Sequence, residues 1–475
     1  MEFMIEKGPH IKDQDTTSKI MKRLLIALIP IIIFSIYKNG IMLYQTGSAT
    51  FYQALRPLIM ILLSVFTSVL IEGLFIWFIL KKQKKQFKEY FKHSYAVFPG
   101  LFLVLVLPIN TPLWAVVFGS IIATIIGKML FGGFGHNIFN PALIGALFVT
   151  SSYGALIASR GGYLNLGEID TVSSATPLTH LSNLNHIGTY DTIINEFGSW
   201  WNYFLGFIPG AIGETSKLLI LIALIYLILT KVIKWQIPVI YISTVFVMTL
   251  IIGLYNDMGW WYPLMHILSG GLMFGAVFMA TDPVTSPISK IGQVYYGLGL
   301  GILTVIFRFL TSYPEGVLTA ILTMNMLVII IDRLGAAVRF DLRKALLPFS
   351  LILLIGLSIS FYTAYAIQPK EEGDDRVTIL DINQINDNTI YHVTTKGFGG
   401  LIEAKIIFQN DKITKIDILN QNESYWLEIN NNNYLNDLIN EQDQISEVDI
   451  VSGATKTSTA LKLMVERVLE ENEKD

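Results

Sequence analysis

The sequence predicts a polytopic α-helical membrane protein with about ten plus one transmembrane helices and a C-terminal extracytoplasmic α+β domain. Three observations support this fold class. Hydrophobic residues make up 52% of the 475 residues, and the mean hydropathy is +0.52, which is too apolar for an ordinary soluble protein. Eleven apolar segments approach the roughly 20 residues that span a bilayer. After Gln368 the chain becomes rich in Asn, Asp, Glu, Lys and Ile.

The apolar segments follow one another from residue 24 onward. Lys38 and Gly40 interrupt the first of them, and the fifth is short and follows a glycine-rich stretch that begins at Gly132. The predicted spans are residues 24–43, 57–80, 95–113, 114–131, 139–153, 215–232, 237–255, 261–280, 293–310, 316–332 and 346–367.

Basic residues are distributed unevenly between the connections. One set of alternate connections holds most of them, namely Lys19, Lys22, Arg23, Lys81, Lys82, Lys84, Lys85, Lys88, Lys92, Lys231, Lys234, Lys290, Arg333, Arg339, Arg343 and Lys344. The other side has few before the last span, mainly Arg56, Arg160, Lys217 and Arg308. Because Lys and Arg concentrate in cytoplasmic loops, we expect a cytoplasmic N-terminus. The loop 154–204 and everything after the last span are then extracytoplasmic.

This topology predicts four parts. They are a cytoplasmic N-terminal segment (1–22), a transmembrane domain (23–335), a transmembrane anchor (345–368) and an extracytoplasmic domain (370–475). Spans one to five begin inside and spans six to ten begin outside, so the two halves have opposite orientations, as in transporters built from inverted repeats. The alternative is that ten spans divide in this way by accident.

The C-terminal domain combines strand and helix patterns. Residues 401–408 and 413–419 alternate apolar and polar side chains, as half-buried strands do. Residues 457–472 have the period of an amphipathic helix, and residues 448–451 before it are strand-like. The sequence therefore predicts a small α+β domain.

A seven-residue pattern occurs once in the long loop and once in the C-terminal domain. The copies, Asp170-Thr-Val-Ser-Ser-Ala-Thr176 and Asp449-Ile-Val-Ser-Gly-Ala-Thr455, share five of seven positions. A Ser-Gly-Ala-Thr sequence after an aspartate resembles the acceptor at which FMN is esterified, through its phosphate, to threonine. Both threonines fall on the predicted extracytoplasmic side. The predicted cofactor-binding residues are Thr176, Thr455, Ser173, Ser452, Gly453 and Ala454.

Each copy also has a simpler interpretation. A phosphate on Thr455 would lie near the free amides at the start of the terminal helix, for which Thr457 or Ser458 is a candidate N-cap. Without a ligand, the same segment is an ordinary helix start. Thr176 precedes a proline, which favours an extended backbone, and we expect its side chain to be exposed. Its alternative is a loop rich in Ser and Thr.

Two further segments combine glycines with Asn-Pro or Asp-Pro. The first runs from Gly132 to Ala142 and contains Asn140, and the second runs from Ser269 to Pro287 and contains Asp282. Backbone groups freed by a helix break at membrane depth must line a cavity or be buried in protein, and an ionisable group there is costly. Asn140 and Asp282 are therefore candidates for an ion pathway. The alternative for Asp282 is a solvated cytoplasmic turn.

Several chemistries find no support in the sequence. The chain has no cysteine, which excludes disulfides, cysteine-ligated iron–sulfur clusters and thiol chemistry within it. The net charge of −3 gives no indication of nucleic-acid binding, and we find no Gly-x-Gly-x-x-Gly element for NADH. His136 and His266 are interpreted as structural residues. We predict no metal site and no catalytic residue in this chain.

The longer motifs resemble those of the D subunit of the Rnf electron-transport complex and of its relative, the B subunit of the sodium-translocating NADH:quinone reductase. The resemblance covers most of residues 20–335, and residues 346–475 resemble the G subunit of the Rnf complex, which has one membrane anchor and an FMN-binding domain. The chain is thus similar to a fusion of the Rnf D and G subunits. The motifs are Phe139-Asn-Pro-Ala142, Ile208-Pro-Gly-Ala-Ile-Gly-Glu-Thr215, Ser269-Gly-Gly-Leu-Met273 and Ala280-Thr-Asp-Pro-Val-Thr-Ser-Pro287.

The resemblance implies an electron-transfer component of a multisubunit, ion-translocating oxidoreductase, linked to ferredoxin and NAD, in the cytoplasmic membrane of a bacterium. It implies two FMN groups, esterified to Thr176 and Thr455 by a separate flavin transferase. Related proteins also hold non-covalent riboflavin, and nothing in the sequence locates it. Other subunits would carry the iron–sulfur and NADH sites, and membrane lipid would surround the chain.

Two departures from the family pattern keep alternatives open. Ser174 stands where the family usually has glycine, which bears on flavin loading at Thr176. Asn422-Glu-Ser-Tyr-Trp426 stands where the Rnf G subunit has Glu-Thr-Pro-Gly. This second departure favours flavin-based extracellular electron transfer without ion pumping. A solute transporter with an external binding domain is the non-redox alternative.

Overall fold

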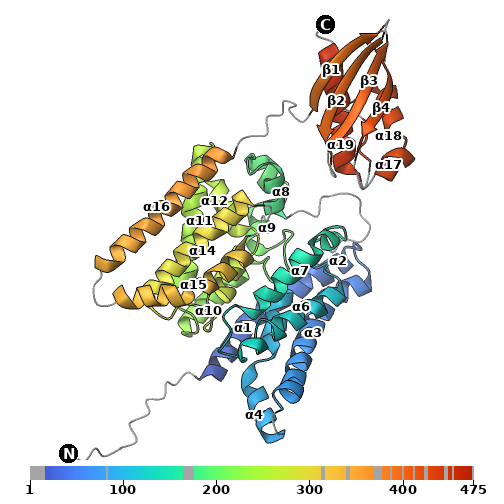
Figure 1. The fold of residues 1–475 in the computed structure, drawn as a ribbon. Coiled ribbons are helices and arrows are strands. Elements are labelled where there is room, and N and C mark those ends of the chain that lie inside the picture. Colours follow the sequence, from blue (N-terminus) through green and yellow to red (C-terminus); the bar gives the residue numbers. More distant parts are fainter. Residues whose placement is uncertain are drawn as a thin grey trace, which may run out of the picture. The chain divides into compact units, whose positions relative to one another are not determined.

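The computed structural model describes residues 16–81, 84–163, 176–311, 316–338, 343–367, 377–385, 388–397, 401–409, 412–421, 426–442, 445, 448–451 and 454–472. The chain divides into two units, residues 1–368 and 369–475. Each unit has its own apolar core, and each is described by itself (Figure 1).

The first half of the membrane unit runs from α1 to α7. Thr50 and Gln53 form a reciprocal capping box at the start of α3, and Asn140 caps α7 with Pro141 as its first residue, which satisfies amides that a helix start leaves free. The elements are α1 (Thr17–Ile36), η1 (Tyr37–Ile41), α2 (Met42–Gln45), α3 (Phe51–Leu74), η2 (Phe75–Ile79), α4 (Lys84–Ser94), α5 (Val97–Leu105), α6 (Leu113–Ile125), η3 (Met129–Phe131) and α7 (Pro141–Ala158).

A loop with short helices leads into the second half, and α16 completes the unit by packing against α11, α14 and α15. The loop contains α8 (Pro177–Asn183), η4 (Asp191–Asn195) and α9 (Trp200–Leu205). The second half contains α10 (Lys217–Leu229), α11 (Gln236–Tyr255), α12 (Trp261–Leu268), α13 (Leu272–Phe274), η5 (Gly275–Met279), α14 (Lys290–Leu310) and α15 (Val317–Val338), and α16 is Arg343–Ala366.

The predicted fold class is confirmed, but not every predicted span crosses as one helix. Among the described residues, eight helices are long and apolar enough to span a membrane. A ninth span forms if α12 and the segment Leu272–Met279, bent by 63° at their junction, are counted together. The predicted spans 95–113 and 215–232 contain only α5 and α10, whose nine and 13 residues are shorter than a bilayer requires.

The two halves break at corresponding places. The third span of the first half ends with α5, and the third span of the second half is the bent pair of α12 and α13. In each half an unbroken helix, α3 or α11, packs against this broken span and against the next long helix, α6 or α14, which in turn packs against α7 or α15. The long helices of each half, α3, α6 and α7 in the first and α11, α14 and α15 in the second, are labelled in Figure 1. The pattern supports the predicted inverted repeat, because interrupted helices at matching positions characterise such folds.

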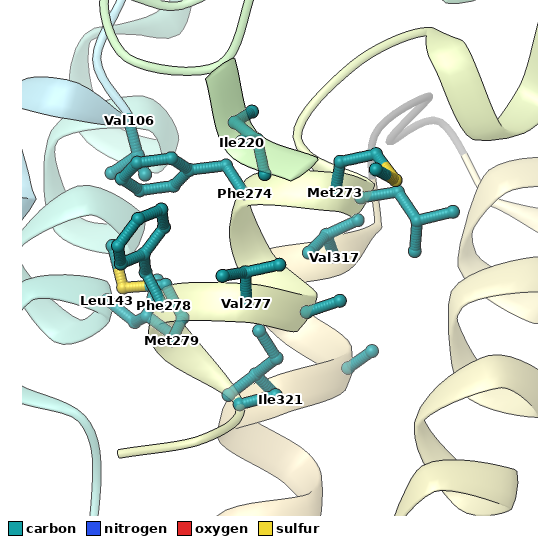
Figure 2. Close-up of a cluster of buried hydrophobic side chains, with 14 of the residues drawn as sticks. Val106, Leu143, Ile220, Met273, Phe274, Val277, Phe278, Met279, Val317 and Ile321 are labelled. Carbon is teal, nitrogen blue, oxygen red and sulfur yellow. The ribbon is translucent and has the colours of Figure 1, made fainter. Parts of the chain in front are cut away.

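The bent segment lies at the centre of the membrane unit. Figure 2 shows Phe274, Val277 and Phe278 of this segment among side chains from both halves. Val106 and Leu143 come from the first half, and Ile220, Val317 and Ile321 come from the second. Because the segment is buried in protein, its irregular backbone is not exposed to lipid.

Close packing of α5 against α3 depends on Gly100. A Cβ added at Gly100 would overlap the carbonyl oxygen of Ser64 and lie 2.6 Å from the Ser68 Oγ. The Ser64 hydroxyl also donates a 2.7 Å hydrogen bond to the Gly100 carbonyl. Small residues permit this approach between membrane helices.

We therefore expect Gly100→Ala to destabilise the membrane unit by about 1–3 kcal/mol, the usual cost of overpacking. The measurement is thermal unfolding of the purified chain in detergent. Gly154→Ala is the matched control, because nothing lies within 4 Å of a Cβ added at this position inside α7. The control should leave stability unchanged or raise it slightly. Equal melting temperatures for the two variants would contradict the packing argument.

The C-terminal unit is a four-stranded antiparallel sheet in the order β1-β2-β3-β4, formed by β1 (Val377–Ile385), β2 (Asn388–Lys396), β3 (Leu401–Gln409) and β4 (Lys412–Asn420). The helix α19 (Thr455–Asn472) packs against β1 and β2. The helices α17 (Trp426–Asn431) and α18 (Tyr434–Asn440) lie between β4 and α19 in the chain. The predicted strands 401–408 and 413–419 correspond closely to β3 and β4.

Two local predictions for this unit are wrong. Residues 448–451 do not form a strand, although Val448 and Val451 are buried in the core as their apolar character suggested. The terminal helix begins at Thr455 rather than after Thr457 or Ser458. The amide and hydroxyl of Ser458 already bond the Ala454 carbonyl, so Ser458 lies inside the first turn and cannot cap it.

Candidate functional site

Thr176 is the N-cap of the short helix α8. Its backbone is extended, with φ −69° and ψ 159°, as expected for a residue before proline. Its hydroxyl oxygen accepts a 3.2 Å hydrogen bond from the Thr179 amide and lies 2.9 Å from the Thr179 hydroxyl. Only 1% of Thr176 is exposed, so the prediction of an exposed side chain is wrong.

The burial of Thr176 follows from the way α8 packs. Leu178 and Leu181 face the apolar core of the membrane unit. The His180 Nε2 lies 2.8 Å from a carboxylate oxygen of Glu196, which joins α8 to the end of η4. The residues next to Thr176 do not predict these contacts, because the core residues and Glu196 lie elsewhere in the chain.

The chain after α8 is also fixed to the membrane helices. The Tyr262 hydroxyl on α12 donates a 3.0 Å hydrogen bond to the His186 carbonyl. The His186 ring packs at 4.8 Å from that of Phe309. Burial lowers the pKa of the His186 imidazole to about 4, so this ring is neutral at pH 7 and adds no charge to the site.

Thr176 in this docked position does not fit an esterified phosphate. A phosphoester would attach a bulky dianionic group to a hydroxyl oxygen that has almost no access to solvent. The same oxygen already serves as the cap of α8. The nearby predicted residue Ser173 lies outside the described residues.

The second candidate acceptor, Thr455, is the first residue of α19. Ala454 before it is buried, its amide bonds the Val451 carbonyl, and its carbonyl accepts the Ser458 amide. The helix of 18 residues has free amides at its start, which suit an anionic group. Ser452, Gly453 and the side chain of Thr455 lie outside the described residues.

Asp282 lies in the turn between the bent segment and α14. Its carboxylate accepts hydrogen bonds from the Thr285 hydroxyl at 3.1 Å and from the Val284 amide at 3.4 Å. Burial raises the pKa of Asp282, although these two hydrogen bonds oppose the rise. The residue is half-buried in the turn, so it is neither a fully solvated carboxylate nor one sealed in the core.

Asn140 links the two halves through Asn325 on α15. The Asn140 amide donates a 3.1 Å hydrogen bond to the Asn325 side-chain oxygen. The Asn325 side-chain nitrogen donates to the Thr285 carbonyl and to the Tyr296 hydroxyl, each at 3.0 Å. Sequence patterns did not identify Asn325, although an amide side chain within a predicted span is a signal that could have done so.

A cavity of about 70 Å³ brings Asn140 and Asp282 together. Its walls are mostly aliphatic and aromatic side chains, and Asn137 and Lys128 add polar groups. A cavity needs roughly 10–15 Å³ to hold a water molecule, so this one has room for water beside its polar side chains. Both ion-pathway candidates therefore border one cavity, where residues from the two halves meet.

A buried ion pair lies at one side of this cavity and was not predicted. The Lys128 ammonium contacts both carboxylate oxygens of Glu72, at 2.8 and 2.6 Å, and the Ser94 carbonyl at 2.5 Å. Glu72 is fully buried, and only 3% of the Lys128 side chain is exposed. Both residues lie within predicted spans, where opposite charges in two apolar runs are a recognisable signal.

Fold and site together define a polytopic membrane protein with a separate α+β module. The two matching halves of the membrane unit meet at a mostly apolar cavity that a few polar side chains border. Comparison with known families is specific for both parts. The NQR2, RnfD, RnfE family matches residues 4–341, and the FMN-binding domain family matches residues 397–470. The chain therefore belongs to the NQR2, RnfD, RnfE family, and its C-terminal unit contains an FMN-binding domain.

Individual relatives agree with this assignment. The D subunit of the proton-translocating ferredoxin:NAD(+) oxidoreductase complex of Clostridium ljungdahlii is 34% identical over 342 residues, which cover 72% of this chain and 97% of the relative. The Na(+)-translocating counterpart from Acetobacterium woodii is 35% identical, covering 70% of this chain and 93% of the relative. The B subunit of the Na(+)-translocating NADH-quinone reductase of Chromohalobacter salexigens is 34% identical, covering 51% and 59% respectively.

These comparisons confirm the predicted resemblance to a fusion of an Rnf D subunit with an FMN-binding domain. They also confirm FMN as the cofactor class of the C-terminal domain. The assigned residues Thr176, Thr455, Asn140 and Asp282 stay predictions about function, because the comparisons do not test single residues.

Proposed function

We propose that this chain is a membrane electron-transfer component of an Rnf-type, ion-translocating oxidoreductase complex. In this proposal FMN is joined by phosphoester bonds to Thr176 and Thr455, both on the extracytoplasmic side, and the N-terminus is cytoplasmic. The bound flavins would supply the redox chemistry and relay electrons, while the protein determines their positions. Riboflavin bound without a covalent link stays a prediction with no assigned site.

One observation carries this proposal. The chain contains two family-matched regions, and each holds one copy of the Asp-x-x-Ser-x-Ala-Thr pattern, ending at Thr176 or at Thr455. A repeated pattern in a chain of this length can arise by chance. Its occurrence once in each of two domains that belong to redox families favours a common chemical role.

The cavity bordered by Asn140 and Asp282 supports ion translocation. The half-buried carboxylate of Asp282 and the buried side-chain amide of Asn140 both border it, between the matching halves. Transporters with inverted repeats bind their ions at this kind of interface. The relatives named for protons and for Na(+) are 34% and 35% identical to this chain. Overall similarity therefore does not select the coupling ion.

The proposed circuit requires other proteins. Iron–sulfur sites would belong to partner subunits because this chain has no cysteine, and the NADH site would too because the chain has no Gly-x-Gly-x-x-Gly element. A flavin transferase would attach FMN. The FMN-binding match favours electron transfer over solute transport. One departure from the Rnf G subunit favours an alternative, which is outward electron transfer without ion pumping. It is the segment 422–426, which stands in place of Glu-Thr-Pro-Gly.

The test uses chains co-expressed with a flavin transferase, denatured and examined for flavin fluorescence on a gel. We expect the wild-type chain to fluoresce, Thr176→Val and Thr455→Val each to lose about half of the signal, and the double variant to lose all of it. A valine cannot accept a phosphoester but preserves the branched shape of threonine. A dark wild-type band, beside a known flavoprotein that the same transferase labels, would refute the two-flavin proposal.

A further inference from the structure

In the structure α8 packs against the membrane unit, and we call this its docked position. This position affects how FMN could be attached to Thr176, which we call loading. Loading forms a bond between the Thr176 Oγ and the FMN phosphorus of a flavin adenine dinucleotide donor. The phosphoanhydride bond to AMP breaks, AMP leaves, and the hydroxyl proton passes to solvent, with nothing oxidised or reduced. This reaction requires the Thr176 oxygen to be accessible, yet only 1% of the residue is exposed.

We propose that the flavin transferase modifies Thr176 only while α8 is undocked from the membrane unit, so that docking of α8 closes the site to modification. The inference rests on the proposed function, since it concerns loading of the same threonine. It identifies the substrate of the transferase at this site as an extended peptide segment rather than the folded surface.

One contact occupies the Thr176 oxygen, and two others hold α8 in the docked position. The Thr176 hydroxyl oxygen accepts the Thr179 amide and is therefore occupied as a cap. Leu181 is fully buried in the apolar core. The His180–Glu196 contact at 2.8 Å joins α8 to the residue that follows η4. A phosphorus centre cannot approach the oxygen while all three persist.

The helix is short enough to open without unfolding the rest of the unit. Seven residues form α8, fewer than an isolated helix needs in water, so its order depends on docking. Local opening of such segments occurs at far lower cost than global unfolding. Weakening the docking contacts should therefore increase the fraction of molecules in which Thr176 is accessible, while the membrane helices stay folded.

The absence of cysteine from the chain allows a test that needs no flavin. Thr176→Cys and, as an accessible reference, Asp191→Cys on the exposed start of η4 are each purified in detergent and labelled with a maleimide. We expect Thr176→Cys to react at least about tenfold more slowly. Adding His180→Gln or Leu181→Ala should accelerate it several-fold, whereas His136→Gln, the same substitution at an exposed histidine elsewhere, should not.

A second measurement follows the modification itself. Chains carrying Thr455→Val report loading at Thr176, and chains carrying Thr176→Val report loading at Thr455. We expect both to be loaded during co-expression with the transferase. When the purified folded chains are treated with transferase and flavin adenine dinucleotide, Leu181→Ala should accelerate loading at Thr176 about tenfold or more and leave the rate at Thr455 unchanged.

The outcomes separate the inference from the proposed function. If Thr176 stays unloaded during co-expression while Thr455 is loaded, the flavin at Thr176 is refuted, and the inference with it. Two other outcomes overturn only the inference. One is that the transferase attaches FMN to Thr176 of the purified chain as fast as in the Leu181→Ala and His180→Gln variants. The other is that maleimide labels Thr176→Cys as fast as Asp191→Cys.

Discussion

Replacement of Lys128 by methionine is expected to destabilise the membrane unit by about 3–5 kcal/mol, the usual effect of leaving one partner of a buried ion pair behind. Glu72 is fully buried. In the described part of the chain, its two carboxylate oxygens accept hydrogen bonds only from the Lys128 ammonium. Methionine matches the length of the lysine stem but carries no charge. The Ser94 carbonyl also loses its donor.

The measurement is thermal unfolding in detergent, with the double variant Glu72→Gln/Lys128→Met as the decisive comparison. Removing both charges removes the uncompensated carboxylate, so the double variant should recover most of the lost stability. Lys231→Met, at an exposed lysine after α10, should stay within about 0.5 kcal/mol of the wild type. A double variant as unstable as Lys128→Met alone would show that the ion pair itself, rather than the isolated carboxylate, determines the cost.

Apolar composition predicted where the chain lies in the membrane, but not where its helices stop. Residues 95–113 are almost uniformly apolar, so the whole run resembled one span, whereas α5 ends at Leu105. Pro108 and Pro112 after it, like Pro283 and Pro287 before α14, mark the irregular segment that follows each broken span. This repeated Pro-x-x-x-Pro spacing was the available signal, because proline disrupts helix interiors.

At the candidate site, the sequence predicted the backbone conformation of Thr176 but not the exposure of its side chain. The motif predicted that Thr176 and Thr455 share a chemical role, and the extended backbone at Thr176 followed correctly from Pro177. Its burial did not follow, because it depends on Leu181 and on the His180–Glu196 contact, which bring distant segments together. Local sequence determines backbone preference, whereas exposure depends on tertiary packing.

Asn325 shows how one side chain can join the two halves, and its replacement by leucine is the second change with a large expected effect. Leucine has nearly the same volume but leaves the Asn140 amide, the Thr285 carbonyl and the Tyr296 hydroxyl without this partner. Each buried polar group left unpaired costs about 1–3 kcal/mol. We therefore expect Asn325→Leu to lower the unfolding free energy by about 3 kcal/mol or more.

Thr323→Val is the matched control on the same helix. The Thr323 hydroxyl donates to the Thr319 carbonyl of its own helix, so its loss breaks no contact between segments and should cost less than about 0.5 kcal/mol. Hydrogen exchange distinguishes a general loss of stability from a local one. Because Asn325 holds the start of α7 and the turn at Thr285 together, amides in both places should exchange faster in Asn325→Leu than in Thr323→Val. Unchanged exchange at these two segments would mean that the hydrogen bonds of Asn325 do not join the halves in solution.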